Sequence, residues 1–218
     1  MIVGSLLALM AFLLAIATGM AADRFDTRRG LVLAEANSIG TTYLRAGYLP
    51  EPASSEIRSL LREYIPLRII ETANLADVRV RIARSAELQT KLWSIAEDLA
   101  RATPESDVLA LFIDSLNETL DLHETRVVAG IYARVPETIL LLLFFGSILT
   151  LGMVGYNAGL TRRRSPVTAF VMIVVLGAVI TLVVDLDRPR DGFLKVNQQP
   201  LIDLQEQVGV LVPANPPE

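Results

Sequence analysis

Two long apolar runs, separated by a short basic turn, constrain this sequence more than any other feature. The runs cover residues 139–155 and 167–184, and neither contains a charged side chain. Each is close to the ~20 residues that a helix needs to cross the ~30 Å hydrocarbon core of a bilayer. Because lipid offers backbone groups no hydrogen-bond partner, a lone spanning segment must be helical. The pattern therefore predicts a transmembrane helical hairpin.

Residues 2–20 form a third apolar run, which is either a signal peptide or a retained membrane helix. A basic n-region is absent and the run is long for the core of a signal peptide, although residues 19–22 resemble a cleavage site. We expect a retained helix, with the signal peptide as the alternative.

The composition indicates that part of the chain lies in water, since 52% of the residues are hydrophobic and 20% are charged. Between the first and second apolar runs, apolar residues recur at helical spacing. We therefore predict an all-α integral membrane protein with three transmembrane helices and a helical extramembrane insert between the first and the second. The predicted segments are a helix (1–22), the module (23–135), a helix (136–160), the basic turn (161–166), a helix (167–186) and a tail (187–218) with a short helix at 200–208 and a disordered end.

Composition also excludes several classes of function. The formal net charge of −4 argues against a nucleic-acid partner, because phosphate binding needs a concentrated basic face. There is no Cys and a single His, so disulfides, thiolate nucleophiles and Cys-ligated metals are excluded. No nucleotide-binding glycine loop, nucleophile elbow or zinc-protease helix occurs. We expect neither an enzyme nor a metal or other cofactor.

The basic turn suggests an orientation. Arg162, Arg163 and Arg164 lie in a short loop without acidic residues, which favours the cytoplasmic side and places the module and the tail on the extracytoplasmic side. Arginines after the first span and in the tail favour the opposite orientation, but long domains count for less in this rule.

Small residues recur on the predicted membrane helices. They form one face of the first helix and a pair on the second, at Gly4, Ala8, Ala11, Ala15, Gly155 and Gly159. Such faces allow close helix packing. We expect packing within the chain first. The alternative is a subunit contact or, for the first helix, a pore-lining face.

A polar group is predicted around the only histidine. His123 lies on an apolar helix face, with Asn117, Asp121 and Arg126 within two turns. It is either a hydrogen-bonded core residue or part of a buried polar cluster that also holds Glu35 or Asn37 from the first helix. In the second case, burial beside carboxylates would make it a proton switch between about pH 5 and 8.

A second charged group follows the last span, at Asp185, Asp187, Arg188 and Asp191. It is either a helix stop with local ion pairs or a charged vestibule that tunes ion entrance. The apolar runs themselves contain no ionisable residue, which disfavours a proton-coupled transporter but not a channel with an apolar constriction.

Four segments carry recognisable short motifs: residues 35–40 (EANSIG), 49–52 (LPEP), 116–123 (LNETLDLH) with Arg126, and 186–189 (LDRP). Together they resemble DUF4239, a family of uncharacterised bacterial membrane proteins that is often labelled bestrophin-like. The resemblance implies a base of paired membrane helices with a helical insert, in the bacterial inner membrane, and a further helix before the one that starts here. The bestrophin label implies an oligomeric anion channel, with the helical region in the cytosol, opposite to the side that the arginine turn favours.

Two functions from different classes follow. The first is a homo-oligomeric channel for a small anion, embedded in the lipid bilayer. The second is a membrane-anchored sensor or scaffold without transport activity.

Overall fold

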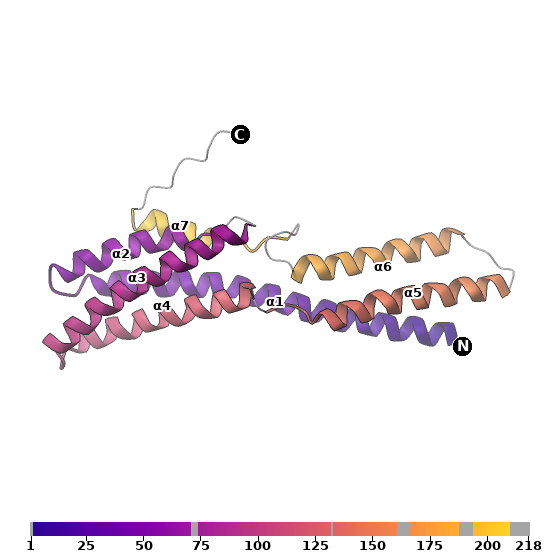
Figure 1. Cartoon of the computed structure of the whole chain (residues 1–218), viewed down its shortest axis with the longest axis horizontal. Coiled ribbons are helices and arrows are strands. Elements are labelled where there is room, and N and C mark those ends of the chain that lie inside the picture. Colours follow the sequence, from indigo (N-terminus) through magenta and orange to yellow (C-terminus); the bar gives the residue numbers. More distant parts are fainter. Residues whose placement is uncertain (1, 71–73, 132, 161–165, 188–193, 210–218) are drawn as a thin grey trace, which may run out of the picture. The chain divides into compact units, whose positions relative to one another are not determined.

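The computed structural model describes residues 2–70, 74–131, 133–160, 166–187 and 194–209. Within these ranges every regular element is an α-helix (Figure 1). The helices are α1 (Ile2–Ala46), α2 (Ala53–Arg68), α3 (Leu75–Ala102), α4 (Asp107–Ile131), α5 (Glu137–Leu160), α6 (Pro166–Asp187) and α7 (Gln199–Gln207). The all-α prediction is confirmed for this part of the chain. Most of the predicted basic turn and the predicted disordered end lie outside the described residues.

Helix α1 is a single element of 45 residues. No proline occurs in it, and Gly30 and Gly40 lower its helix propensity without interrupting it. The first apolar run therefore continues directly into a polar helical segment.

The chain forms two compact units, and α1 contributes to both. Unit 1 comprises Met1–Thr27 and Ile131–Lys195, and unit 2 comprises Arg28–Gly130 and Val196–Glu218. This division places the segment that starts at Val196 in the same compact unit as most of the predicted insert.

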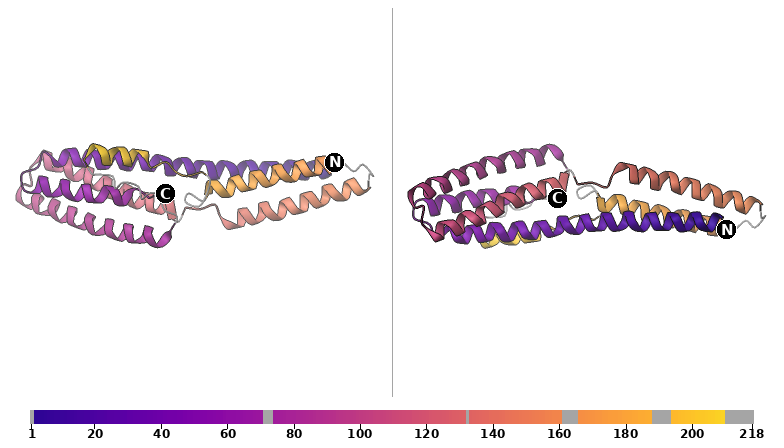
Figure 2. Two further views of the ribbon diagram at one scale, coloured as in Figure 1. Left: turned by 90° about the horizontal axis from the view of Figure 1, so that it is seen from above. Right: turned by 90° about the horizontal axis from the view of Figure 1, so that it is seen from below.

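Unit 1 contains the first part of α1 together with α5 and α6, which run side by side (Figure 2). Its buried apolar residues include Met10, Ala17, Leu143, Leu176 and Val183. Many of its other large apolar side chains point outward, as suits helices in lipid. Helices α1, α5 and α6 are long and apolar enough to cross a membrane, so the three predicted spans are confirmed as candidates.

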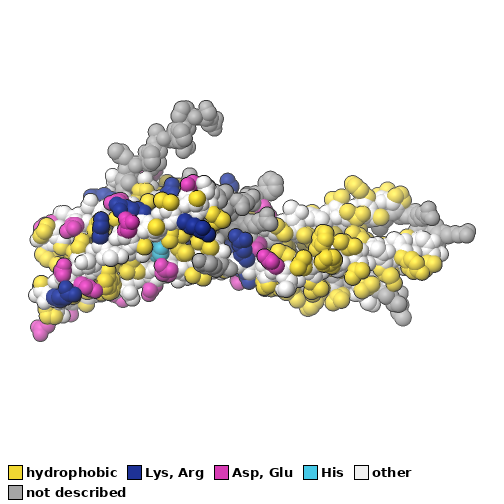
Figure 3. Space-filling model, in the orientation of Figure 1, with side chains coloured by type: hydrophobic (Ala, Val, Ile, Leu, Met, Phe, Trp, Pro, Cys, Tyr) yellow, Lys and Arg dark blue, Asp and Glu magenta, His cyan; other side chains and the backbone are white. Residues whose placement is uncertain are grey.

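Unit 2 packs the rest of α1 with α2, α3, α4 and α7 around its own apolar core. The largest fully buried apolar side chains include Ile39, Ile57, Leu61, Leu88 and Phe112. On the face of this unit that Figure 3 shows, charged side chains of both signs are scattered among apolar and other side chains. The short helix predicted at 200–208 is α7, which buries Leu201 and Leu204 in this core.

Candidate functional site

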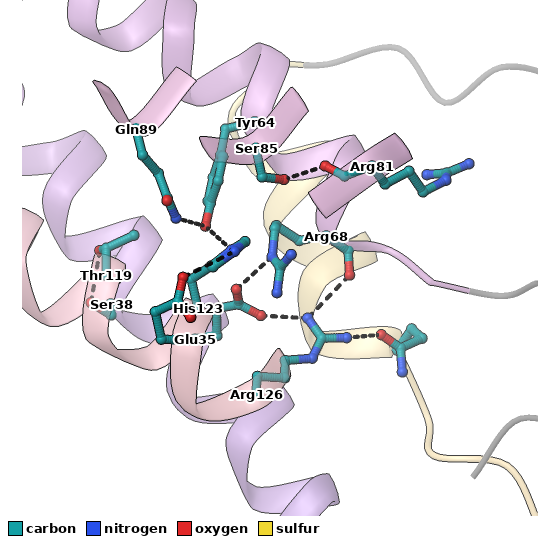
Figure 4. Close-up of polar contacts among 12 residues, drawn as sticks. Glu35, Ser38, Tyr64, Arg68, Arg81, Ser85, Gln89, Thr119, His123 and Arg126 are labelled. Atoms are coloured by element: carbon teal, nitrogen blue, oxygen red, sulfur yellow. Dashed lines mark hydrogen bonds and ion pairs between the residues drawn. The ribbon is translucent and has the colours of Figure 1, made fainter. Parts of the chain in front are cut away.

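A carboxylate shared by two guanidinium groups lies in the core of unit 2 (Figure 4). Helix α1 places Glu35 there with 0% of its side chain exposed. Arg68 Nε donates to Glu35 Oε1 at 2.6 Å, and Arg126 Nη1 donates to Glu35 Oε2. The arginine side chains are 1% and 10% exposed. A carboxylate that is so buried is stable only because both oxygens accept charge-assisted hydrogen bonds.

Four segments meet at this triad. Arg68 is the last residue of α2, which ends two residues after Pro66, a residue without a backbone N–H to donate. Arg126, from α4, also donates to the Arg68 carbonyl oxygen at 3.0 Å and to the side-chain oxygen of Gln198, at the start of α7. The cluster therefore ties α1, α2, α4 and the C-terminal segment together.

A chain of neutral hydrogen bonds lies beside the triad. Gln89 Nε2, from α3, donates to Tyr64 Oη at 3.1 Å, and Tyr64 Oη lies 3.0 Å from His123 Nδ1. Burial raises the pKa of Tyr64 to about 12, so its hydroxyl keeps its proton at neutral pH. With Gln89 donating to Tyr64, the hydroxyl is free to donate to Nδ1, and this favours the tautomer with the proton on Nε2.

The surroundings of His123 favour the neutral imidazole. Burial first, and then the positive charges of Arg68 and Arg126, lower its pKa to about 3. The Glu124 carboxylate lies 4.0 Å from Nε2, but its side chain is 74% exposed and solvent screens it. The predicted proton switch between pH 5 and 8 does not fit this environment, because burial and then the two arginines, and not carboxylates, determine the pKa of His123.

The depressed pKa predicts a specific loss of stability in acid. The unfolded chain binds a proton at His123 near pH 6.5, whereas the folded chain does so only near pH 3. The contribution of the neutral histidine to the free energy of unfolding is therefore fully present above about pH 6.5. As the pH falls towards 3, the free energy of unfolding decreases by about 1.4 kcal/mol per pH unit.

We expect His123→Asn to lose this contribution while the amide keeps a hydrogen bond to Tyr64. Denaturant titrations in detergent between pH 6 and 4 measure how steeply the free energy of unfolding of each protein depends on pH. The other titratable groups are the same in both proteins, so the difference between the two slopes reports His123. Parallel slopes would contradict the assignment.

Hydroxyl groups join α1 and α4 next to the charged cluster. Ser38 Oγ lies 2.8 Å from Thr119 Oγ1, and Thr42 Oγ1 donates to the Ser115 carbonyl oxygen at 2.9 Å. All four residues are buried. Small hydroxyl side chains let the backbones of α1 and α4 approach closely. This contact lies beside the ion pair between Glu35 of α1 and Arg126 of α4.

A family model for the bestrophin-like domain matches residues 1–201, nearly the whole chain. The chain belongs to the bestrophin-like family. The recognition drawn from the short motifs is therefore confirmed. A comparison with curated proteins finds no match.

Solved structures share the fold of this bestrophin-like protein. A point variant of a bacterial bestrophin homologue from Klebsiella pneumoniae superposes with a TM-score of 0.70 at 18% identity, over 94% of this chain and 87% of its own. A crystal structure described as that of a membrane protein superposes with a TM-score of 0.76 at 16% identity, over 94% and 84%. At these identities the similarity establishes the fold alone.

Three of the six residues predicted for the polar cluster of this bestrophin-like protein meet in its core: Glu35, His123 and Arg126. Asn37, Asn117 and Asp121 are exposed, so their expected burial is wrong. The reason is helical geometry. A residue two positions from a buried one is turned by about 200° and faces away from the core, as Asn37 is from Glu35 and Asp121 from His123.

The group predicted after the last span is only partly described. Asp187 is 6% exposed and accepts a hydrogen bond from the Val135 backbone amide at 2.8 Å, just before α5 begins. Asp185 accepts from the Leu194 amide at 3.0 Å. Arg188 and Asp191 lie outside the described residues. The two described carboxylates therefore hold backbone amides, in keeping with a helix stop.

The small-residue faces do not pack within unit 1. Gly4, Ala8, Ala11, Ala15, Gly155 and Gly159 are all exposed. The described part of α1 instead packs through Met10, Ala17 and Ala21. The close approach occurs at Gly146 of α5, where an added Cβ would lie 3.3 Å from Met10 Sδ. The expected packing within the chain is therefore a wrong prediction for these six residues.

Sequence reasoning missed four of the seven residues of this hydrogen-bonded cluster. Three of them, Tyr64, Arg68 and Gln89, lie in the predicted helical module, and Gln198 lies in the predicted tail. Tyr64 on an apolar helix face was the one available signal, because a buried tyrosine needs a polar partner for its hydroxyl.

Proposed function

We propose that this bestrophin-like protein forms a homo-oligomeric channel for small anions in the bacterial inner membrane. Membership of the family supports a membrane protein of the channel type. The apolar stretches of α1, α5 and α6 carry no ionisable side chain apart from those at their ends, which suits a pore with an apolar constriction.

The observation that carries the proposal is that the small-residue face of α1 is exposed. Gly4, Ala8, Ala11 and Ala15 are exposed, although small residues usually mark a helix contact in a membrane. A Cβ added at Gly4 would meet nothing within 4 Å among the described atoms. A second copy of the chain could therefore approach this face closely, and repetition of that contact around an axis would enclose a path.

Reconstitution into liposomes tests the proposal. We expect liposomes that contain the purified protein to release trapped chloride faster than protein-free liposomes. We also expect the protein solubilised in mild detergent to be larger than a monomer. Impermeant gluconate is the matched control anion. A monomer that releases neither ion would overturn the channel function.

We further propose that unit 2 faces the extracytoplasmic side, as the arginine turn favours. The chain has no Cys, so a single label site can be introduced by Ser94→Cys on the exposed side of α3. We expect a membrane-impermeant maleimide to label this variant in spheroplasts before permeabilisation. Labelling that requires permeabilisation would place unit 2 in the cytosol, where the bestrophin label implies it.

The competing function is a membrane-anchored scaffold. It is favoured by the unbroken course of α1 from its apolar start into the core of unit 2. A scaffold predicts an assembled protein without ion release, so the liposome measurement separates the two functions.

A further inference from the structure

The guanidinium group of Arg68 is only partly satisfied in the core of unit 2. Its Nε donates to Glu35, but Nη1 and Nη2 have no hydrogen-bond partner among the described residues. The side chain is 1% exposed, so bulk water does not reach these nitrogens. Buried donors without partners are rare in native proteins because their desolvation is not compensated. Arg68 therefore offers two donors that an additional acceptor would stabilise.

Among the residues that the structure describes, the same cluster carries more positive than negative charge. Arg68 and Arg126 share the single carboxylate of Glu35. Glu35 is the one buried carboxylate among the described residues of unit 2. Tyr64 and His123, the other titratable groups that face the pair, are neutral at neutral pH. One net positive charge is left in a low-dielectric core, which is unfavourable without a counter-charge.

The alternatives to an anion compensate less. The Tyr64 ring lies 5.9 Å from the Arg68 guanidinium carbon and offers a π face, but a ring at this distance is a weak partner. A water molecule would accept from Nη1 or Nη2 and leave the charge unchanged. An anion satisfies both the donors and the charge.

We propose that a small monovalent inorganic anion of the chloride class binds Arg68 Nη1 and Nη2 in the core of unit 2. Both nitrogens are buried in this conformation, so the anion reaches them only when a neighbouring side chain moves. The Arg126 side is nearest to solvent, because Arg126 is 10% exposed and its partner Gln198 is half-buried. The site is formed within one chain and does not depend on whether the protein conducts.

Bromide is a direct probe of this site, because it replaces chloride and scatters anomalously. We expect crystals of the full chain grown with bromide to show an anomalous peak within hydrogen-bond distance of Arg68 Nη1 or Nη2. Peaks confined to the surface, an adventitious ion only, would overturn the proposal. So would ordinary water density beside Arg68 without an anomalous peak.

A solution measurement tests the same site without crystals. Replacing gluconate by chloride at constant ionic strength should raise the melting temperature of the full chain in detergent by about 3 °C at saturation, since a ligand stabilises the state that binds it. Arg126→Gln removes the excess charge and Arg68→Gln removes the donors, so each should abolish the chloride effect. Arg79→Gln, on the exposed side of α3, should keep it.

Each outcome of that measurement is informative. A chloride effect that survives in either core variant would overturn the proposal, as would its absence in the wild-type protein. If one core variant does not fold, the other and the bromide experiment still decide. A protein that shows the bromide peak but releases no chloride from liposomes retains this site and loses only the channel function.

Discussion

Glu35→Gln is expected to lower the melting temperature of the detergent-solubilised protein by about 10 °C. The substitution keeps the size of the side chain but removes the charge that Arg68 and Arg126 share in the core. Breaking a buried ion pair by removing one partner costs about 3–5 kcal/mol, because it leaves an uncompensated buried charge. For a domain of this size each kcal/mol corresponds to roughly 2–4 °C.

The matched control is Glu118→Gln, which makes the same chemical change at an exposed position of α4. Surface substitutions of this kind usually change stability by less than about 0.5 kcal/mol. Thermal unfolding followed by circular dichroism compares the two variants with the wild-type protein. Equal melting temperatures for both variants would show that Glu35 does not hold the two arginines in the folded state.

Ala11→Trp is expected to dissociate the proposed oligomer and to stop chloride release from liposomes. The residue lies in the middle of the open small-residue face of α1, where a large ring would separate two closely packed backbones. Overpacking costs about 1–3 kcal/mol at each contact. Association is then weakened by roughly 5-fold to 140-fold per contact.

Leu9→Trp is the control for this prediction. Leu9 lies on α1 close to Ala11 in sequence but on a different side of the helix, and it already exposes a large apolar side chain. Size-exclusion chromatography in mild detergent should give an oligomer for Leu9→Trp and a monomer for Ala11→Trp. An Ala11→Trp protein that elutes and conducts like the wild type would exclude this face as a subunit contact.

The membrane helices could be predicted because a single physical requirement fixes them. A run of about 20 apolar residues has to be helical in lipid whatever it packs against. The ends of the other helices depend on local hydrogen bonds and were harder to place. Thr103 and Pro104 are residue types typical of a helix start, but α4 begins at Asp107, where Ser106 accepts a hydrogen bond from the Leu109 amide at 3.3 Å.

Only those residues of the charged site whose burial follows from helical spacing could be predicted. Glu35, His123 and Arg126 share their helix faces with buried apolar residues, so their burial follows from periodicity. The partnership of Arg68 with Glu35 joins residues 33 positions apart, and that of Arg126 with Gln198 joins residues 72 apart. Such pairs depend on how α2 and the C-terminal segment return to the core, which local patterns do not encode.

The place of α7 in the core of unit 2 sets an order of events during biosynthesis. Leu201 is fully buried and Gln198 holds Arg126, so this core is incomplete until the last part of the chain has left the ribosome. Helices α5 and α6 precede these residues in the chain, so they leave the ribosome first. We therefore expect the hairpin to insert into the bilayer before the helical core closes, and nascent chains stalled before Gln198 to be open to proteases around Glu35.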